Sequence, residues 1–183
     1  SGHVNAVGFE LYCQMLSEAV ANLEENPQEM ASLAQQAAFV ELPIPAFLPE
    51  EYISNLPQRL AIYQRLAAIF TLEDCLSIEQ EILDRFGPLP EEVRNLIFVV
   101  KMKTQARIAC LESITSDSNT IILRMKQPVG GARLALQNTL GPNLKVGEFS
   151  IRIPKMVGWN KMLEEALSRL IDFRNQLLEM TNV

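Results

Sequence analysis

The stretch EQEILDRFGPLPEEV, residues 79–93, constrains the fold more than any other part of the sequence. Gly87 can adopt the backbone conformations with positive φ that end a helix, and Pro88 cannot continue one. Pro90 suits the first turn of a following helix, where the acidic pair Glu91–Glu92 complements the positive end of the helix dipole. The stretch therefore predicts a rigid corner between two helices.

The periodicity of apolar residues predicts five longer helices. They are expected at residues 7–24, 56–70, 71–86, 90–111 and about 158–180. At the start of the third, Thr71 and Asp74 have the spacing of a capping box. Its expected buried residues are Leu72, Cys75, Leu76, Ile82, Leu83 and Phe86. For the helix at 56–70 they are Leu60, Tyr63, Leu66, Ala67 and Phe70.

The sequence pattern changes near residue 112. Short alternating segments around the turns SDSN and VGE predict two hairpins, with a short helix ending at Gly141 between them. We therefore expect an α+β fold, in which a mainly helical N-terminal lobe, residues 1–111, carries one edge strand near 38–44. A small β-β-α-β-β-α lobe follows at residues 112–183 and ends in a long C-terminal helix; the two lobes are expected to form one integrated domain.

Charge and composition narrow the function classes. The chain has 183 residues and a net charge of -6, which argues against a general nucleic-acid surface. The widely spaced cysteines indicate a reducing compartment, so we expect a cytoplasmic protein. The chain begins SGHVNAVGF, without an initiator methionine, and we expect it to be a piece of a longer protein.

Enzyme signatures are missing from the sequence. No phosphate-binding loop of the G-x-x-x-x-G-K-[ST] type occurs, and His3 is the only histidine, which disfavours a nucleophile–histidine pair and a histidine metal site. Cys13, Cys75 and Cys110 are expected as small apolar core residues. We therefore expect no catalytic residue, cofactor or metal in this chain.

One acidic helix face is a candidate binding site. Glu81 and Asp84 are one turn apart, beside the corner and away from the apolar row. A solvated face with Glu81 paired to Arg85 is the simpler interpretation of this spacing. The other interpretation is a docking point for arginines of a partner, because carboxylates held in place can accept paired hydrogen bonds from guanidinium groups.

Three blocks of the sequence resemble a known family. They are SGHVNAVGFELYCQMLSEAV, VELPIPAFLPEEYISNLPQRLAIYQRLA and EQEILDRFGPLPEEVRNL. In this order they resemble the C-terminal domain of the bacterial transcription-repair coupling factor (Mfd) family, strongly over residues 1–111 and in layout beyond them.

The resemblance implies a regulatory role. Members of the family are ATP-driven translocases on double-stranded DNA that displace stalled RNA polymerase and recruit the damage sensor UvrA, using ATP and Mg in motor domains outside this region. The C-terminal domain is implied to be an autoinhibitory clamp that covers the UvrB-like, UvrA-recruiting module of its own protein. Glu81 and Asp84, ahead of RFG, match the family's acidic contact positions, so the resemblance favours docking over a solvated face. Arg85 is expected either to orient Glu81 at this partner-binding site or simply to pair with it.

Two alternatives are carried forward with this interpretation. The chain could be a stand-alone adaptor whose partner is another protein, which binding assays with candidate partners would reveal. It could also be an enzyme that uses surface carboxylates on a small substrate, which a ligand-induced rise in melting temperature would indicate.

Overall fold

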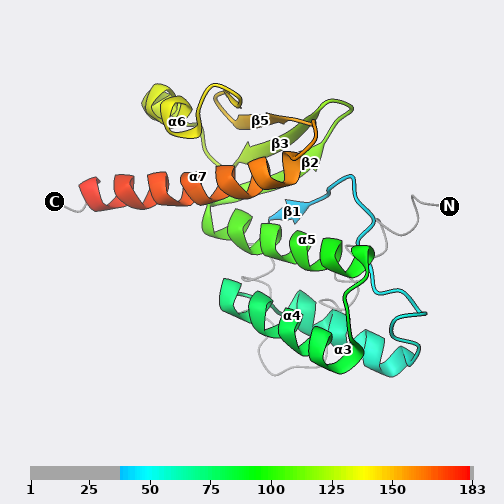
Figure 1. Ribbon diagram of the computed structural model, residues 1–183. Coiled ribbons are helices and arrows are strands. Elements are labelled where there is room, and N and C mark those ends of the chain that lie inside the picture. The colour runs from blue at the N-terminus through cyan, green and yellow to red at the C-terminus, as the bar shows by residue number, and fades with distance from the viewer. Residues whose placement is uncertain (1–37, 182–183) are drawn as a thin grey trace. The chain divides into compact units, whose positions relative to one another are not determined.

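The computed structural model describes residues 38–181, and the helix expected at 7–24 lies outside them. The chain forms two compact units, which divide between Thr104 and Gln105. Figure 1 labels helices and strands of both. Residues 38–42 belong to the second unit, although they precede the helices of the first in sequence.

The first unit contains the helices expected around the corner. They are α3 (Leu56–Ala67), α4 (Leu72–Phe86) and α5 (Glu91–Ile108). The helix α3 begins where Asn55 caps it, its Oδ1 accepting a hydrogen bond from the amide of Gln58 at 2.9 Å. Since α3 ends at Ala67, Phe70 lies beyond it and is 42% exposed, and Ile62 and Leu66 are the buried residues of this helix.

The helix α5 is buried on several sides along its part in the first unit. Its buried residues there are Val93, Leu96, Ile97, Val99, Val100, Met102 and Thr104. Because buried positions occur on several sides of α5, the apolar residues of its sequence are not confined to one narrow face. Thr104, a polar residue within this core, donates from Oγ1 to the carbonyl of Val100 at 3.0 Å, so its hydroxyl is satisfied inside the helix.

The second unit contains a five-stranded sheet in the order β1-β2-β3-β5-β4. Its strands are β1 (Phe39–Val40), β2 (Leu111–Ser116), β3 (Thr120–Met125), β4 (Lys145–Val146) and β5 (Ser150–Pro154). The two hairpins confirm the sequence prediction. Strand β1 lies at the edge and pairs in parallel with β2, with Phe39 opposite Ser113. The pattern near 38–44 could not show this long-range partner, and the sequence division had placed the strand with the helical lobe.

One row of paired apolar residues crosses the whole sheet of the second unit. Val40, Ile114, Leu123, Ile151 and Val146 are paired from strand to strand and form one row across all five strands. Every member of this row is at most 9% exposed. A one-residue slip of any strand would turn its apolar side chains to the opposite face, so this row specifies the register.

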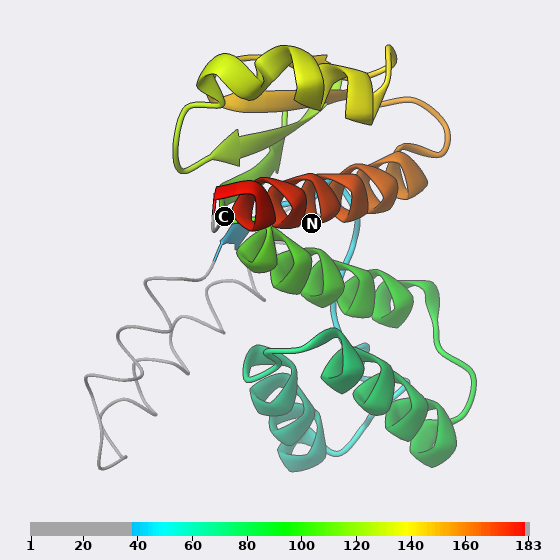
Figure 2. The same ribbon diagram turned by 90° about the vertical axis from the view of Figure 1, so that its left-hand side faces the viewer.

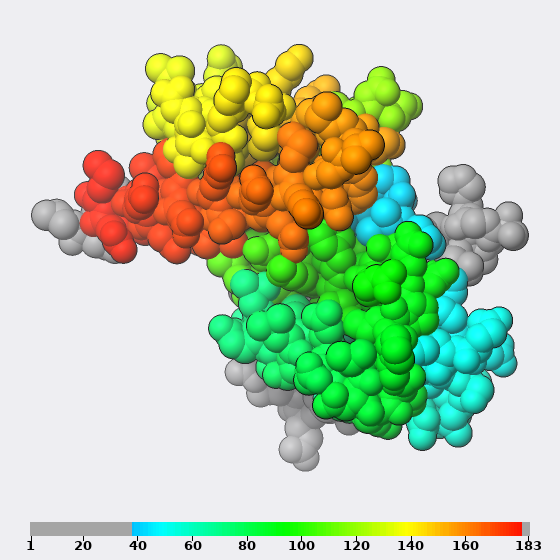
Figure 3. Space-filling model, viewed as in Figure 1, coloured from blue at the N-terminus to red at the C-terminus, as the bar shows by residue number. Residues whose placement is uncertain are grey.

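Two helices pack on the sheet. They are α6 (Arg133–Leu140), preceded by the short 3-10 turn η1 (Gly130–Ala132), and the long C-terminal α7 (Trp159–Thr181). Figure 2 shows α6 in yellow beside the C-terminal hairpin in orange, and Figure 3 shows its atoms resting on those of α7. Contacts of α6 with β4 and of α7 with β5 complete this layer, which confirms the α+β fold.

Candidate functional site

The helix α4 carries the candidate site, and its start is fixed by a capping box. Thr71 Oγ1 accepts a hydrogen bond from the amide of Asp74 at 3.1 Å, and Asp74 Oδ2 accepts one from the amide of Thr71 at 3.3 Å. Both bonds satisfy amides that the first turn leaves without helical partners. The capping box expected from the sequence is confirmed, and it fixes the residue at which the helix begins.

Glu81 is engaged within the chain by two arginines. Arg65 of α3 donates from Nη1 and Nη2 to the two carboxylate oxygens at 2.5 and 2.6 Å, and Arg85 donates from Nη1 to Oε1 at 2.8 Å. Hydrogen bonds from Arg65 and then Arg85 lower the pKa of Glu81 to about 2. The expected pairing with Arg85 is present, and Arg65 is a partner that the sequence did not reveal.

Asp84 lies on a different part of α4 from Glu81. It is exposed, and its Oδ1 accepts a hydrogen bond from Gln80 Nε2 at 2.7 Å, one turn earlier. Glu81, in contrast, faces Arg65 and its side chain is 32% exposed. The two acids are therefore one turn apart, as expected, but of the two only Asp84 is exposed.

The buried face of α4 differs from the expected one. Cys75, Ile78 and Ile82 are its buried residues, whereas Leu76 is 65% and Leu83 is 40% exposed. The prediction that both leucines lie in the core was wrong, because packing in the unit turns a different row, spaced by three and four residues, toward the interior. Leu76 and Leu83 are about 100° around the helix from that row.

The exposed leucines share a stripe with polar groups. Leu76, Gln80 and Asp84 follow one another at spacings of four residues, and Leu83 lies three residues after Gln80. These four side chains therefore form one continuous strip, here called the α4 stripe. It combines exposed apolar area with a carboxylate and an amide. Such a combination suits contact with a partner surface that is apolar and basic.

The corner after α4 is held rigidly. Gly87 has φ of 85°, a conformation that favours glycine, and its amide donates to the carbonyl of Leu83 at 2.9 Å. Tyr52 donates from its hydroxyl to the carbonyl of Gly87 at 2.7 Å, and its ring centroid lies 6.1 Å from that of Phe86. Arg85 lies over the Phe86 ring at 5.0 Å. The sequence predicted the turn but not the role of Tyr52.

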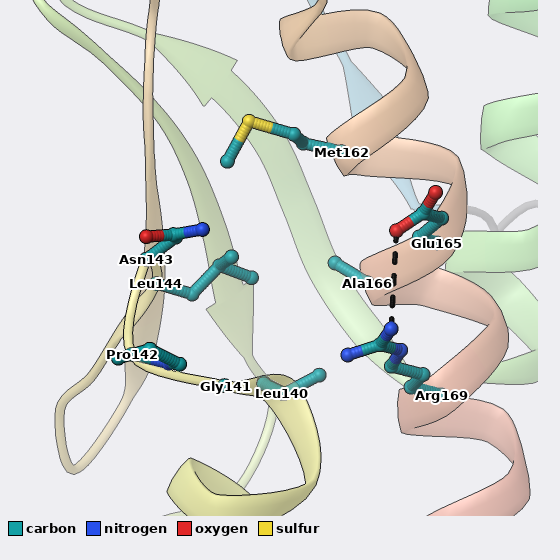
Figure 4. A pocket seen from close by; sticks show the side chains of 9 residues that line it. All are labelled: Leu140, Gly141, Pro142, Asn143, Leu144, Met162, Glu165, Ala166 and Arg169. Atoms are coloured by element: carbon teal, nitrogen blue, oxygen red, sulfur yellow. Dashed lines mark ion pairs between the residues drawn. The ribbon is translucent and has the colours of Figure 1, made fainter.

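A shallow hollow of about 180 Å³ lies in the second unit. Leu140–Leu144 line one side, and Met162, Glu165, Ala166 and Arg169 of α7 line the other (Figure 4). Arg169 lies 3.9 Å from Glu165 and donates from Nη1 to the carbonyl of Thr139 at 3.4 Å. Both charged groups are engaged within the unit, and the lining residues include no nucleophile–base pair.

The cysteines divide into two kinds. Cys75 is buried with its sulfur 3.9 Å from Thr104 Oγ1, and burial raises the pKa of its thiol, in accord with a core role. Cys110 is exposed with φ of 56°, so the prediction that it fills the core was wrong. It lies between the end of α5 at Ile108 and the start of β2 at Leu111. Cys13 lies outside the described residues.

Within residues 38–181 no cluster of three or more histidine, cysteine, aspartate or glutamate side chains could hold a metal ion. In the same part of the chain no helix has the length and apolar character needed to cross a membrane.

The fold and site define an α+β domain that carries a candidate docking surface on a helix next to a rigid corner. Residues 42–130 match the family model described as TRCF domain, and this part of the chain belongs to that family. The family resemblance inferred from the three sequence blocks is thereby confirmed.

Curated relatives of the chain are named transcription-repair-coupling factor. The chain is 32% identical over 151 residues to the transcription-repair-coupling factor of Bacillus subtilis (strain 168). It is 36% identical over 151 residues to that of Staphylococcus epidermidis (strain ATCC 12228 / FDA PCI 1200). Each alignment covers 80% of this chain and 13% of the relative, so the chain spans about an eighth of these proteins.

A solved structure has the same fold. The crystal structure of the C-terminal domain of transcription-repair coupling factor aligns with a TM-score of 0.60 and 19% identity, covering 77% of this chain and 97% of that one. At this identity the likeness concerns the fold alone.

Proposed function

We propose that this chain is the regulatory clamp domain of a longer transcription-repair coupling factor. In this role it covers the UvrB-like module of the same protein and withholds it from UvrA. It is released when the ATP-driven translocase, on double-stranded DNA, engages stalled RNA polymerase in the cytoplasm. Support comes from the family match over residues 42–130 and from the fold shared with a C-terminal domain of that name.

The α4 stripe is the observation that carries the proposal. A helix face that only meets water gains nothing from two leucines at 65% and 40% exposure, whereas a docked face buries them. Asp84 stands beside Leu83 on the same strip. An arginine of the UvrB-like module would bind this carboxylate while apolar neighbours bury the leucines.

Glu81 and Arg85 would act by shaping this surface. Glu81 forms ion pairs with Arg65 and Arg85 and holds both guanidinium groups in place. Its negative charge also offsets part of their positive charge close to Asp84. An approaching basic partner would otherwise be repelled by these guanidinium groups. We therefore assign the direct contact to Asp84 and a positioning role to Glu81, with Arg85 held on the Phe86 ring.

The energy required is modest. Holding the recruiting module closed 99% of the time needs about 2.7 kcal/mol of closing free energy. Loss of one partner from a buried, hydrogen-bonded charge pair costs about 2–5 kcal/mol. One arginine–carboxylate contact with two buried leucines is therefore sufficient to govern the clamp.

The experiment uses a coupling factor from which the corresponding C-terminal domain has been deleted. Its binding to UvrA is measured while this chain is titrated in, and we expect the chain to reduce binding. Asp84→Arg and Leu83→Gln should each abolish the competition. Asp172→Arg, an exposed acid on α7, is the matched control and should compete like the wild type.

A covalently joined version removes the dependence on concentration. If the wild-type chain fails to mask UvrA binding even when joined to the deleted protein, the clamp proposal is wrong. If masking occurs but survives Asp84→Arg and Leu83→Gln together, the clamp docks through another surface.

A further inference from the structure

A second surface of the first unit lies at the N-terminus of α5 and shares no residue with the α4 stripe. It is a groove of about 390 Å³ lined by Phe47, Pro49, Glu51, Tyr52, Pro90 and Glu92, here called the corner groove. This volume is within the range of about 300–1,000 Å³ typical of ligand pockets. None of its lining residues belongs to the α4 stripe, so its use does not depend on the proposed clamp.

Backbone hydrogen bonds hold the walls of the groove. The amide of Phe47 donates to the carbonyl of Glu92 at 3.3 Å, and the amide of Tyr52 donates to the carbonyl of Pro49 at 3.1 Å. Pro49 and Pro90, which also line the groove, restrict the backbone at their own positions. The groove is therefore formed before any partner arrives, which lowers the entropic cost of binding.

The aromatic rings of the groove are oriented by the corner. The Tyr52 hydroxyl is committed to the carbonyl of Gly87 at 2.7 Å, and its ring packs at 59° to that of Phe86. Burial raises the pKa of Tyr52, so its hydroxyl remains a donor to that carbonyl. What Tyr52 offers to the groove is its ring, and Phe47 contributes a second half-buried ring.

Both charged side chains that line the groove are carboxylates, so its charge is negative. Glu51 is exposed and Glu92 is half-buried, and neither forms an ion pair with any side chain in residues 38–181. Aromatic rings together with uncompensated carboxylates attract a cation, by cation–π contact and by charge-assisted hydrogen bonds. Anions and nucleic-acid phosphates are repelled by the same groups.

We propose that the corner groove binds an arginine side chain presented by a basic segment of another polypeptide. A planar guanidinium stacks on an aromatic ring while its N–H groups reach a carboxylate, and this geometry favours arginine over lysine. The carboxylates of Glu51 and Glu92 accept the hydrogen bonds, and Tyr52 and Phe47 provide the apolar and aromatic walls.

The test is a titration of this chain, labelled with ¹⁵N, by the blocked peptide acetyl-Gly-Arg-Arg-Gly-amide at low salt. The comparison peptide replaces both arginines with citrulline, which keeps the planar group and loses the charge. We expect the arginine peptide to shift resonances of Phe47, Tyr52 and their neighbours, and the citrulline peptide to bind at least fivefold more weakly.

Two double variants distinguish binding at the corner groove from a general attraction of the basic peptide to an acidic protein. Glu51→Gln with Glu92→Gln should weaken binding of the arginine peptide at least fivefold. Glu50→Gln with Glu91→Gln makes the same charge change at the adjacent positions, which do not line the groove, and should weaken it less than twofold. Equal melting temperatures for the two variants establish that both fold alike.

Several results would overturn the proposal. These are no binding of the arginine peptide, equal binding of the citrulline peptide, equal loss in the two double variants, and resonance shifts that avoid Tyr52 and Phe47. None of these outcomes decides the clamp, because the peptide assay does not involve UvrA. Binding of the peptide at Asp84 of the α4 stripe would shift resonances of α4 and would persist in the variant with Glu51→Gln and Glu92→Gln.

Discussion

Arg65 and Glu81 form a bidentate ion pair across two helices. Both terminal nitrogens of Arg65 donate to the two carboxylate oxygens of Glu81, at 2.5 and 2.6 Å, although the residues are 16 positions apart. The pair ties α3 to α4, and the same carboxylate also accepts from Arg85. A surface acid that the family resemblance assigned to docking thus has partners within the chain and holds α4 to α3.

The strength of this pair can be measured by a double-mutant cycle. Arg65→Ala, Glu81→Ala and the double variant should give a coupling free energy of about 0.5–1 kcal/mol, at the upper end for exposed pairs because the geometry is bidentate. Urea unfolding followed by circular dichroism supplies the free energies. Arg85→Ala with Glu81→Ala, a single hydrogen bond between neighbouring turns, is the comparison and should show a smaller coupling. Equal couplings would mean that the link between helices adds nothing.

The pH dependence of stability has a defined sign at Glu81. Its pKa is about 2 in the folded chain, below the ordinary value of 4.5. The group therefore stabilises the fold above about pH 4.5, and this contribution disappears as the pH falls through 2. The free energy of unfolding of the wild type should exceed that of Glu81→Gln by up to about 1 kcal/mol at neutral pH, because screening limits an exposed pair. Urea unfolding at several pH values between 6 and 2 checks this, and a difference that stays constant over the range would contradict it.

Much of the fold follows from local chemistry. The helices around Gly87 and the hairpin turn at Asp117 were predictable because turn and capping residues act on their immediate neighbours. The pairing of Phe39 with Ser113 and of Arg65 with Glu81 was not, since each joins segments that are brought together only by tertiary packing. No local pattern encodes such partners.

The buried face of α4 was predicted wrongly for a different reason. Leu76 and Ile78 are equally apolar, so hydrophobicity alone could not tell which of the two points inward. The rotation of the helix is decided by packing in the unit, for example the approach of Cys75 to Thr104. The exposed leucines of the α4 stripe were therefore predicted in the core.

The corrected face of α4 makes a direct prediction about stability. Ile78→Ala and Ile82→Ala should each lower the free energy of unfolding by about 2–5 kcal/mol, because both side chains are buried at 4% and 1% exposure. Leu76→Gln and Leu83→Gln should change it by less than about 0.5 kcal/mol, as expected for surface sites. Chemical denaturation of the four variants measures these values. A large loss from either leucine variant would place that side chain in the core after all.

The hydroxyl of Tyr52 should contribute to the rigidity of the corner. Tyr52→Phe keeps the ring beside Phe86 and removes the hydrogen bond to the carbonyl of Gly87. We expect a loss of about 0.5–1.5 kcal/mol, the usual net contribution of one hydrogen bond. Thermal unfolding gives the change. Tyr63→Phe, which removes the hydroxyl that accepts from the amide of Leu48 at 2.8 Å, is a comparison at a second tyrosine.

Cys110 provides a prediction in which a substitution stabilises the chain. Its φ of 56° lies in the left-handed region, which costs a residue with a side chain roughly 1–2 kcal/mol and which glycine adopts freely. Because glycine also loses more entropy on folding, we expect Cys110→Gly to raise the free energy of unfolding by only about 0.5–1 kcal/mol. Cys110→Ala, which removes the thiol but keeps the strain, should be close to neutral, and Cys110→Val should be destabilising because a β-branched side chain tolerates positive φ poorly. Urea unfolding under reducing conditions compares the three variants. If Ala stabilised as much as Gly, the thiol rather than the backbone would be the source of the effect.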